Sequence, residues 1–188
     1  MEKILIVSKT PASIEKLSNM IEKCCAQLIK GVLSARDAAE KLDETEYDII
    51  VINAPLADDS GLSLAQKARA KDVGIVLLIN SDVVDKVQEV TEELGAFLVE
   101  KPINPPLLIQ GIRFVAAAQK RYISLRLENS RLAQKVEDIK VINRAKCCLM
   151  QTLNLSESAA HRYIEKQAMD TRKPKRHVAE RILKTYEF

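Results

Sequence analysis

The sequence has few of the residues that bend or break a chain: its 188 residues include 5 Gly and 6 Pro. Their scarcity favours short loops and argues against a many-stranded β-sandwich. No apolar run reaches the roughly 18 residues that a membrane-spanning helix requires, so we expect no membrane association. The first nine residues lack a small-residue cleavage site, so we expect no signal peptide. The 47% hydrophobic and 29% charged residues are typical of a soluble, globular, largely helical chain.

Cysteine is also sparse, and its four residues form two adjacent pairs, Cys24-Cys25 and Cys147-Cys148. Neighbouring cysteines do not readily hold one metal ion together, and neither Cys-x-x-Cys nor a Cys/His metal spacing occurs. We interpret them as reduced thiols packed in helices, and we expect a cytoplasmic protein without a metal or other cofactor.

The net charge of +3 conceals an uneven distribution. Residues 1–119 carry 13 Lys and Arg against 18 Asp and Glu, a net charge of −5, whereas residues 120–188 carry 16 against 8, a net charge of +8. An acidic first part and a basic second part are typical of a regulator with a nucleic-acid-binding end. An enzyme is not expected, because the sequence has no Gly-rich phosphate loop and no nucleophile–base pair.

The first hundred residues alternate between short apolar runs and stretches with helical periodicity. Strands are predicted at residues 3–7, 26–33, 49–52, 75–79 and 96–99, and helices at 11–25, 35–42, 61–71, 82–94 and from about 106. The third run is entirely apolar, which indicates a strand buried on both faces. Five β-then-α units predict an α/β domain over residues 1–119, with a five-stranded doubly wound parallel sheet and right-handed crossovers.

Beyond residue 107 the sequence shows only helical signals. One set of residues recurs at alternating spacings of three and four: Tyr122, Leu125, Asn129, Leu132, Val136, Ile139 and Asn143. This heptad pattern predicts a coiled-coil helix over residues 120–142 and a homodimer. Asn129 at a core position favours a parallel pair, because two such amides bond only in one register. The alternative is a single amphipathic helix packed on its own domain.

A small three-helix module is predicted over residues 130–188, overlapping the end of the coil. The chain turns at residues 153–155, and Ser156 is a suitable N-cap for a helix over 157–169. A final helix follows with Pro174 in its first turn, where the missing N–H costs nothing.

Residues 1–119 resemble the receiver domain of two-component response regulators. The resemblance is carried by the strand order, the run Tyr47–Asn53, Pro55, Gly61 and the dipeptide Lys101-Pro102. It implies an Asp at the end of the third strand that accepts a phosphoryl group, and an acidic pair after the first strand that helps to hold Mg²⁺. It also implies a Thr or Ser and a Lys that sense the phosphate.

The sequence departs from that pattern at the reacting positions. Ser8 and Lys9 replace the acidic pair, Asn53 stands at the acceptor position, and only Lys101 matches. The hydroxyl position falls on Ile79 or Asn80, next to Ser81.

Receiver phosphorylation needs a carboxylate nucleophile and a hard cation bound by oxygen atoms. We therefore predict a degenerate receiver, a pseudo-receiver, in which Lys9 and Lys101 bond Asn53 or neighbouring carbonyls and hold one conformation. Asp58 and Asp59 remain alternative acceptors. The domain then serves either as a dimerisation scaffold or as a docking site for a sensing or regulatory protein.

The second half resembles the ANTAR domain over roughly residues 130–185, in the segments 143–150, 155–162, 167–174 and 178–183. The ANTAR domain is a three-helix RNA-binding module of transcription antitermination regulators. The resemblance implies binding of paired hairpins in a leader transcript, which keeps a terminator from forming. The sequence departs from the family at Cys147, where Gly is usual, at His161 and at Lys175.

Basic side chains in this segment can neutralise RNA phosphates: Arg144, Lys146, Arg162, Lys166, Arg172, Lys173, Lys175 and Arg176. His161, Tyr163 and Arg172 are candidates for stacking on splayed loop bases. Ala145, Ala160, Ala168 and Met169 are interpreted as packing residues between helices.

The sequence thus predicts an RNA-binding transcription antiterminator that acts as a homodimer. One alternative is a DNA-binding response regulator, because two short helices after a turn resemble a helix-turn-helix. Another is an adaptor that binds only protein partners.

Overall fold

The computed structural model describes residues 3–22 and 28–186. The chain forms two compact units that divide between Ile123 and Ser124. Cys24 and Cys25 lie outside the described residues, as do the end of the helix predicted over 11–25 and the start of the strand predicted over 26–33.

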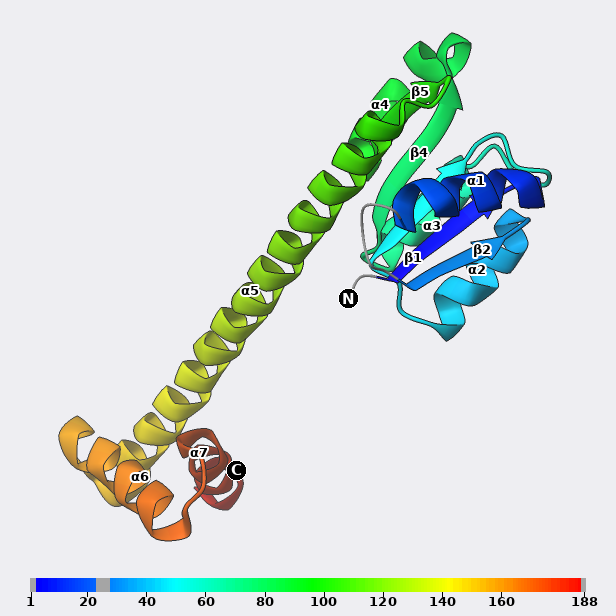
Figure 1. Ribbon diagram of the computed structural model, residues 1–188. Helices are drawn as coiled ribbons and strands as arrows, with labels where there is room; N and C mark the ends of the chain where they lie inside the picture. The colour runs from blue at the N-terminus through cyan, green and yellow to red at the C-terminus, as the bar shows by residue number, and fades with distance from the viewer. Residues whose placement is uncertain (1–2, 23–27, 187–188) are drawn as a thin grey trace. The chain divides into compact units, whose positions relative to one another are not determined.

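The first unit alternates strands and helices, as predicted. Its elements are β1 (Lys3–Ser8), α1 (Pro11–Glu22), β2 (Leu28–Val32), α2 (Ala35–Glu44), β3 (Ile49–Asn53), α3 (Leu62–Ala70), β4 (Gly74–Asn80), the 3₁₀ turn η1 (Ser81–Val83), α4 (Val84–Leu94), β5 (Phe97–Lys101) and the beginning of α5 (Pro105–Leu153). All paired strands are parallel, in the order β2-β1-β3-β4-β5 (Figure 1). This arrangement confirms the predicted five-stranded doubly wound sheet.

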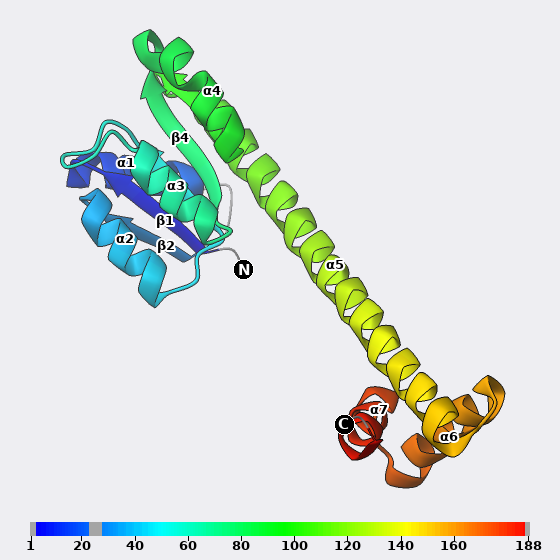
Figure 2. The same cartoon turned by 180° about the vertical axis from the view of Figure 1, so that it is seen from behind.

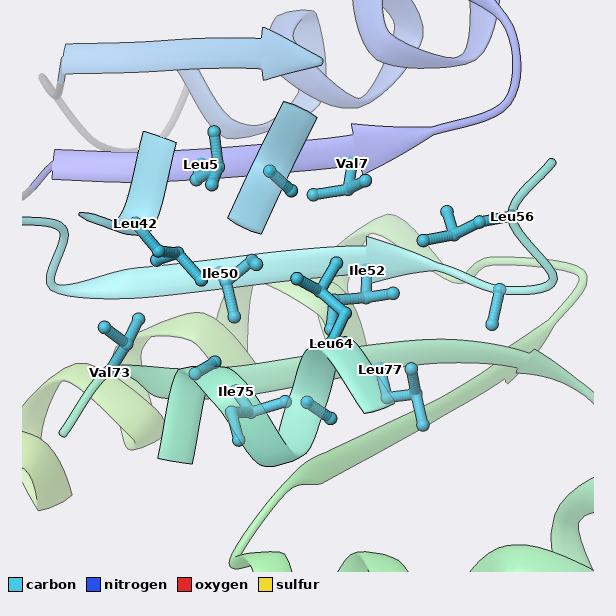
Figure 3. Packing of buried hydrophobic residues seen from close by; sticks show 14 of the residues in the cluster. Leu5, Val7, Leu42, Ile50, Ile52, Leu56, Leu64, Val73, Ile75 and Leu77 are labelled. Atoms are coloured by element: carbon cyan, nitrogen blue, oxygen red, sulfur yellow. The ribbon is translucent and has the colours of Figure 1, made fainter. Parts of the chain in front are cut away.

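Helices cover both faces of the sheet because the central strands are apolar on both sides. Helix α1 and the start of α5 pack on one face, where Ile6 and Val51 of the sheet belong to the same core as Leu17 and Ile112 of these helices. Helices α2, α3 and α4 pack on the other face, which Figure 2 shows from behind. Figure 3 shows this second core, in which side chains of β1, β3 and β4 meet residues such as Leu64 of α3.

Local sequence signals start and stop the helices. The Ser34 hydroxyl accepts a hydrogen bond of 3.0 Å from the backbone N–H of Asp37 and so caps the N-terminus of α2. Gly61 precedes α3 with a φ of 97°, and a Cβ built there would lie 3.0 Å from Ala54 Cβ. Glycine suits this position because its backbone reaches left-handed angles without steric cost.

The second unit contains the C-terminal part of α5, α6 (Glu157–Thr171) and α7 (Lys175–Tyr186). Its core is formed by the three helices together: Ala145, Leu149, Ala160, Ile164, Val178, Ala179, Ile182 and Leu183. The Ser156 hydroxyl accepts a hydrogen bond of 3.3 Å from the backbone N–H of Ala159, as expected of the predicted N-cap.

Two packing predictions in this unit are wrong. Met169 is 71% exposed, because it lies on the face of α6 opposite the buried Ala160 and Ile164. Cys147 is exposed rather than packed, whereas its neighbour Cys148 lies partly buried against the core. The added side chain of Cys147 therefore points to solvent.

Within the described part of the chain, no helix is both long enough and apolar enough to cross a bilayer. No group of three or more His, Cys, Asp or Glu side chains in residues 3–22 and 28–186 is arranged to hold a metal ion.

Candidate functional site

The carboxyl ends of the parallel strands bring Ser8, Asn53 and Lys101, three of the residues predicted to form a degenerate receiver site, to one edge of the sheet. Ser8 and Asn53 are register partners at the ends of β1 and β3, and Lys101 is the register partner of Asn80 at the ends of β5 and β4. The Asn53 amide Nδ2 donates a hydrogen bond of 2.9 Å to Ser8 Oγ, and Ser8 is completely buried. Asn53 Oδ1 is also buried and has no hydrogen-bond partner among the described residues.

Lys101 is turned toward the backbone next to Asn53. Its Nζ donates a hydrogen bond to the carbonyl oxygen of Ala54, so the predicted bond to a neighbouring carbonyl is present. Partial burial holds the pKa of Lys101 below its ordinary value, and the positive charge of nearby Lys9 lowers that pKa further. Lys9 itself is exposed.

The two alternative acceptor carboxylates are engaged elsewhere. Asp58 accepts hydrogen bonds of 2.8 and 3.1 Å from the backbone N–H groups of Ala35 and Arg36, in the first turn of α2. These bonds lower the pKa of Asp58, because they stabilise its ionised form. Asp59 accepts a bond of 2.5 Å from the backbone N–H of Gly61 and another from the Ser63 hydroxyl. Both side chains thus stabilise helix starts.

Three of the predicted RNA-binding cations form ion pairs between helices of the second unit. Lys146 Nζ of α5 lies 2.9 Å from Glu157 Oε1 of α6, and Lys175 Nζ of α7 lies 2.5 Å from Glu165 Oε1 of α6. Arg176 Nη1 of α7 lies 2.7 Å from Asp138 Oδ1 of α5. The pKa values of these three carboxyls fall below their ordinary range, chiefly because of the hydrogen bonds from their basic partners. These cations therefore connect the three helices.

Other predicted cations project from α6 and the turn after it. Arg162 and Lys166 lie one helical turn apart on the exposed face, and Arg172 follows the last turn with a φ of 51°. None of these three forms an ion pair within residues 3–22 and 28–186. Lys173 is exposed with its Nζ 3.2 Å from His177 Nε2, and Arg144 is exposed on α5. The predicted RNA-binding cations without an ion pair to a described residue therefore include three on α6 and at its C-terminal end, Arg162, Lys166 and Arg172.

The two stacking candidates on α6 differ in their surroundings. His161 Nε2 lies 3.2 Å from Glu165 Oε1, the carboxylate that also pairs with Lys175. Tyr163 is 39% exposed.

Met169 also lies on the exposed face of α6, three residues after Lys166, although the sequence predicted it to be a packing residue. Its helical spacing from Lys166 was the signal that could have placed it there.

The residues of the predicted coiled-coil seam are exposed in the single chain. The aliphatic members Leu125, Leu132, Val136 and Ile139 are 54%, 52%, 51% and 58% exposed. Asn129 is exposed as well. Tyr122 at the start of the seam is 41% exposed and lies under a guanidinium, with Arg69 Cζ 5.8 Å from its ring centroid. The aliphatic seam is thus left largely uncovered by the described part of the chain.

Both halves of the chain resemble known proteins. The ANTAR domain family model matches residues 130–183. The transcriptional regulatory protein PdtaR of Mycobacterium tuberculosis is 23% identical over 171 residues, which are 90% of this chain and 83% of that protein. The regulatory protein VanR of Enterococcus faecium is 28% identical over 119 residues, which are 62% of this chain and 51% of VanR.

Solved structures match the first half. The signal receiver domain of an HD domain-containing protein from Pseudomonas fluorescens aligns with 65% of this chain and 92% of its own length, with a TM-score of 0.59 and 17% identity. This likeness shows the fold of the first unit. The chain therefore consists of a domain with the response-regulator receiver fold followed by an ANTAR domain, the organisation of a transcriptional regulator of the antitermination type.

Proposed function

We propose that this protein is an RNA-binding transcription antiterminator, which acts as a homodimer on paired hairpins of a leader transcript. The ANTAR match and the similarity along the chain to a transcriptional regulatory protein support this proposal. The surface of the second unit supplies the physical argument for RNA binding.

The observation that carries the proposal is the exposed basic face of α6. Arg162, Lys166 and Arg172 are not neutralised by carboxylates of the described chain, and their charges remain available for phosphates. Binding phosphates releases condensed counterions, so affinity should fall steeply as salt rises. The exposed Tyr163 ring lies on the same helix and offers a stacking surface for an unpaired base.

The first unit is proposed to regulate without enzymatic chemistry. Asn53 supplies an amide where phosphorylation needs a carboxylate nucleophile, and Lys9 supplies a positive charge where Mg²⁺ would bind. The Asn53–Ser8 hydrogen bond joins β1 and β3 directly at this position. A regulatory protein partner remains one route by which a signal reaches this unit.

Dimerisation is proposed to occur through the exposed seam of α5. Pairing two copies would remove Leu125, Leu132 and Ile139 from water, which is the main driving force of a coiled coil. Asn129 would then meet its counterpart and select the parallel register.

The decisive experiment measures binding of the full chain to a two-hairpin leader RNA, to the same RNA with unpaired stems, and to duplex DNA. We expect preference for the paired hairpins and a strong salt dependence. The variant Arg162→Gln/Lys166→Gln should bind more weakly and reduce the slope of log K against log salt by about 2. The matched control Lys184→Gln removes an exposed charge on α7 and should bind like the wild type.

Two outcomes would contradict the proposal in different ways. Equal affinity for duplex DNA would favour the alternative of a DNA-binding response regulator. Absence of binding to either nucleic acid would favour a protein-binding adaptor.

A further inference from the structure

A small apolar cavity lies beside the degenerate receiver site. It has a volume of about 180 Å³ and is bordered by apolar side chains from β4, η1, α3 and α4, among them Leu62, Leu77, Ile79, Val83 and Val87. Leu77 is one of the core side chains shown in Figure 3. The cavity is comparable in volume to an engineered cavity of about 150 Å³ that binds benzene.

The cavity and the Lys101 ammonium share two neighbours. Ala54 lines the cavity, and its carbonyl oxygen accepts the hydrogen bond from Lys101 Nζ. Asn80 lines the cavity as well, and it is the register partner of Lys101 at the ends of β4 and β5. An ammonium carries three N–H donors, so the bond to Ala54 leaves two for another acceptor.

Two ammonium groups lie near each other at this edge of the sheet. Lys9 and Lys101 are close enough for their charges to interact, and neither forms an ion pair within residues 3–22 and 28–186. The two carboxylates of the loop after β3, Asp58 and Asp59, bond to backbone groups at the starts of α2 and α3. An anion between the two ammonium groups would therefore relieve their repulsion.

The position in the fold agrees with a ligand site. In open α/β sheets, ligands bind in the crevice outside the carboxyl ends of the strands. Ser8, Asn53, Asn80 and Lys101 mark these ends in four adjacent strands. In a phosphorylated receiver the reacting positions of this edge would hold a cation and a carboxylate, whereas here Lys9 and Asn53 stand at those positions.

We propose that this edge of the sheet binds a small organic carboxylate, whose anionic group lies between Lys9 and Lys101 and whose apolar body fills the cavity lined by Leu77, Ile79, Val83 and Val87. The volume limits that body to an aromatic ring or a short branched chain. The ligand would give the first unit a direct chemical input that requires no phosphorylation, and its binding does not depend on the RNA-binding function.

The experiment titrates the full chain with benzoate, by calorimetry and by ligand-observed NMR. Benzamide has nearly the same shape without the charge, and acetate has the charge without the ring. We expect benzoate to bind at least about tenfold more tightly than either, because it alone uses both the ammonium groups and the cavity. No binding of benzoate, or equal binding of benzamide or acetate, would overturn the proposal.

Variants of the chain test the ammonium groups and the apolar cavity separately. Lys101→Met should weaken benzoate binding about tenfold or more, and Lys9→Gln should also weaken it. The Lys9 variant keeps the test valid if loss of the Lys101–Ala54 bond perturbs folding, because Lys9 is exposed. Val83→Phe should abolish benzoate binding by filling the cavity. Lys86→Gln, an exposed charge change on α4, is the matched control and should leave it unchanged. Unaltered benzoate binding in Lys9→Gln and Val83→Phe would exclude this site.

Discussion

Asn53 and Ser8 are joined by a hydrogen bond of 2.9 Å from Nδ2 to Oγ, at the ends of two adjacent parallel strands. In a receiver that is phosphorylated, two carboxylates at such positions would repel each other and attract Mg²⁺. Here an amide and a hydroxyl satisfy each other in part, and no cation is needed to hold them together. The bond therefore links the ends of β1 and β3 directly.

The wild-type chain should not form an acyl phosphate with acetyl phosphate and Mg²⁺, because Asn53 has no carboxylate. Asn53→Asp alone should also fail, since Lys9 still repels Mg²⁺. Ser8→Asp/Lys9→Asp/Asn53→Asp should regain Mg²⁺ binding and phosphorylation, because it restores three oxygen ligands. Intact mass spectrometry with hydroxylamine treatment measures the product. A stable acyl phosphate on the wild type would show that Asp58 or Asp59 is the acceptor.

Leu132→Glu should convert the dimer into a folded monomer. Leu132 is 52% exposed in the single chain, so a charge there is tolerated by the monomer and buried only in a coiled coil. Leu127→Glu is the matched control, because Leu127 is 58% exposed but lies outside the seam. Sedimentation equilibrium distinguishes the two variants. Equal effects of both substitutions, or a wild type that is monomeric, would contradict the seam.

Ile164→Ala should lower the free energy of unfolding of the C-terminal unit by about 2–5 kcal/mol, because Ile164 is 1% exposed and its truncation leaves a cavity. Met169→Ala, on the same helix, should change it by less than about 0.5 kcal/mol, because Met169 is 71% exposed. Urea unfolding followed by far-UV circular dichroism measures both. A large loss in Met169→Ala would mean that Met169 packs against protein in solution.

The C-terminal unit should lose stability in acid. The pKa values of Asp138, Glu157 and Glu165 are lowered in the folded state by their basic partners. Their contribution to the free energy of unfolding is therefore complete above the unfolded-state carboxyl pKa of about 4. It disappears as the pH falls through the lower pKa values of the folded state. Thermal unfolding between about pH 6 and pH 3 measures this dependence.

A matched variant separates these carboxylates from the rest of the chain. Glu157→Gln/Glu165→Gln should be less stable than the wild type at pH 6 and should lose less stability on acidification, because two of the three lowered carboxyls are gone. If this variant loses as much stability on acidification as the wild type does, other carboxyls determine the acid dependence.

Local sequence patterns were sufficient for the architecture. The apolar run Ile49–Ile52 can be buried on both faces only in a sheet covered by helices on both sides, and the structure has that sheet. Ser34 and Ser156 mark helix starts because capping depends on residues three positions apart. The amide at Asn53 and the ammonium at Lys9, on which the predicted loss of phosphorylation rests, are likewise readable from residue identity alone.

Only the tertiary structure decided which charges are available. Lys175 and Lys166 are both basic residues in the same segment, yet Lys175 pairs with Glu165 across two helices and Lys166 is exposed on α6. Composition cannot separate them, because an ion pair depends on which helix faces meet. The same reason applies to Met169, whose exposure follows from the side of α6 that packs on α5 and α7. The cavity beside Lys101 is also a tertiary feature, since its walls come from two separate segments, residues 54–62 and 77–87, which the fold brings together.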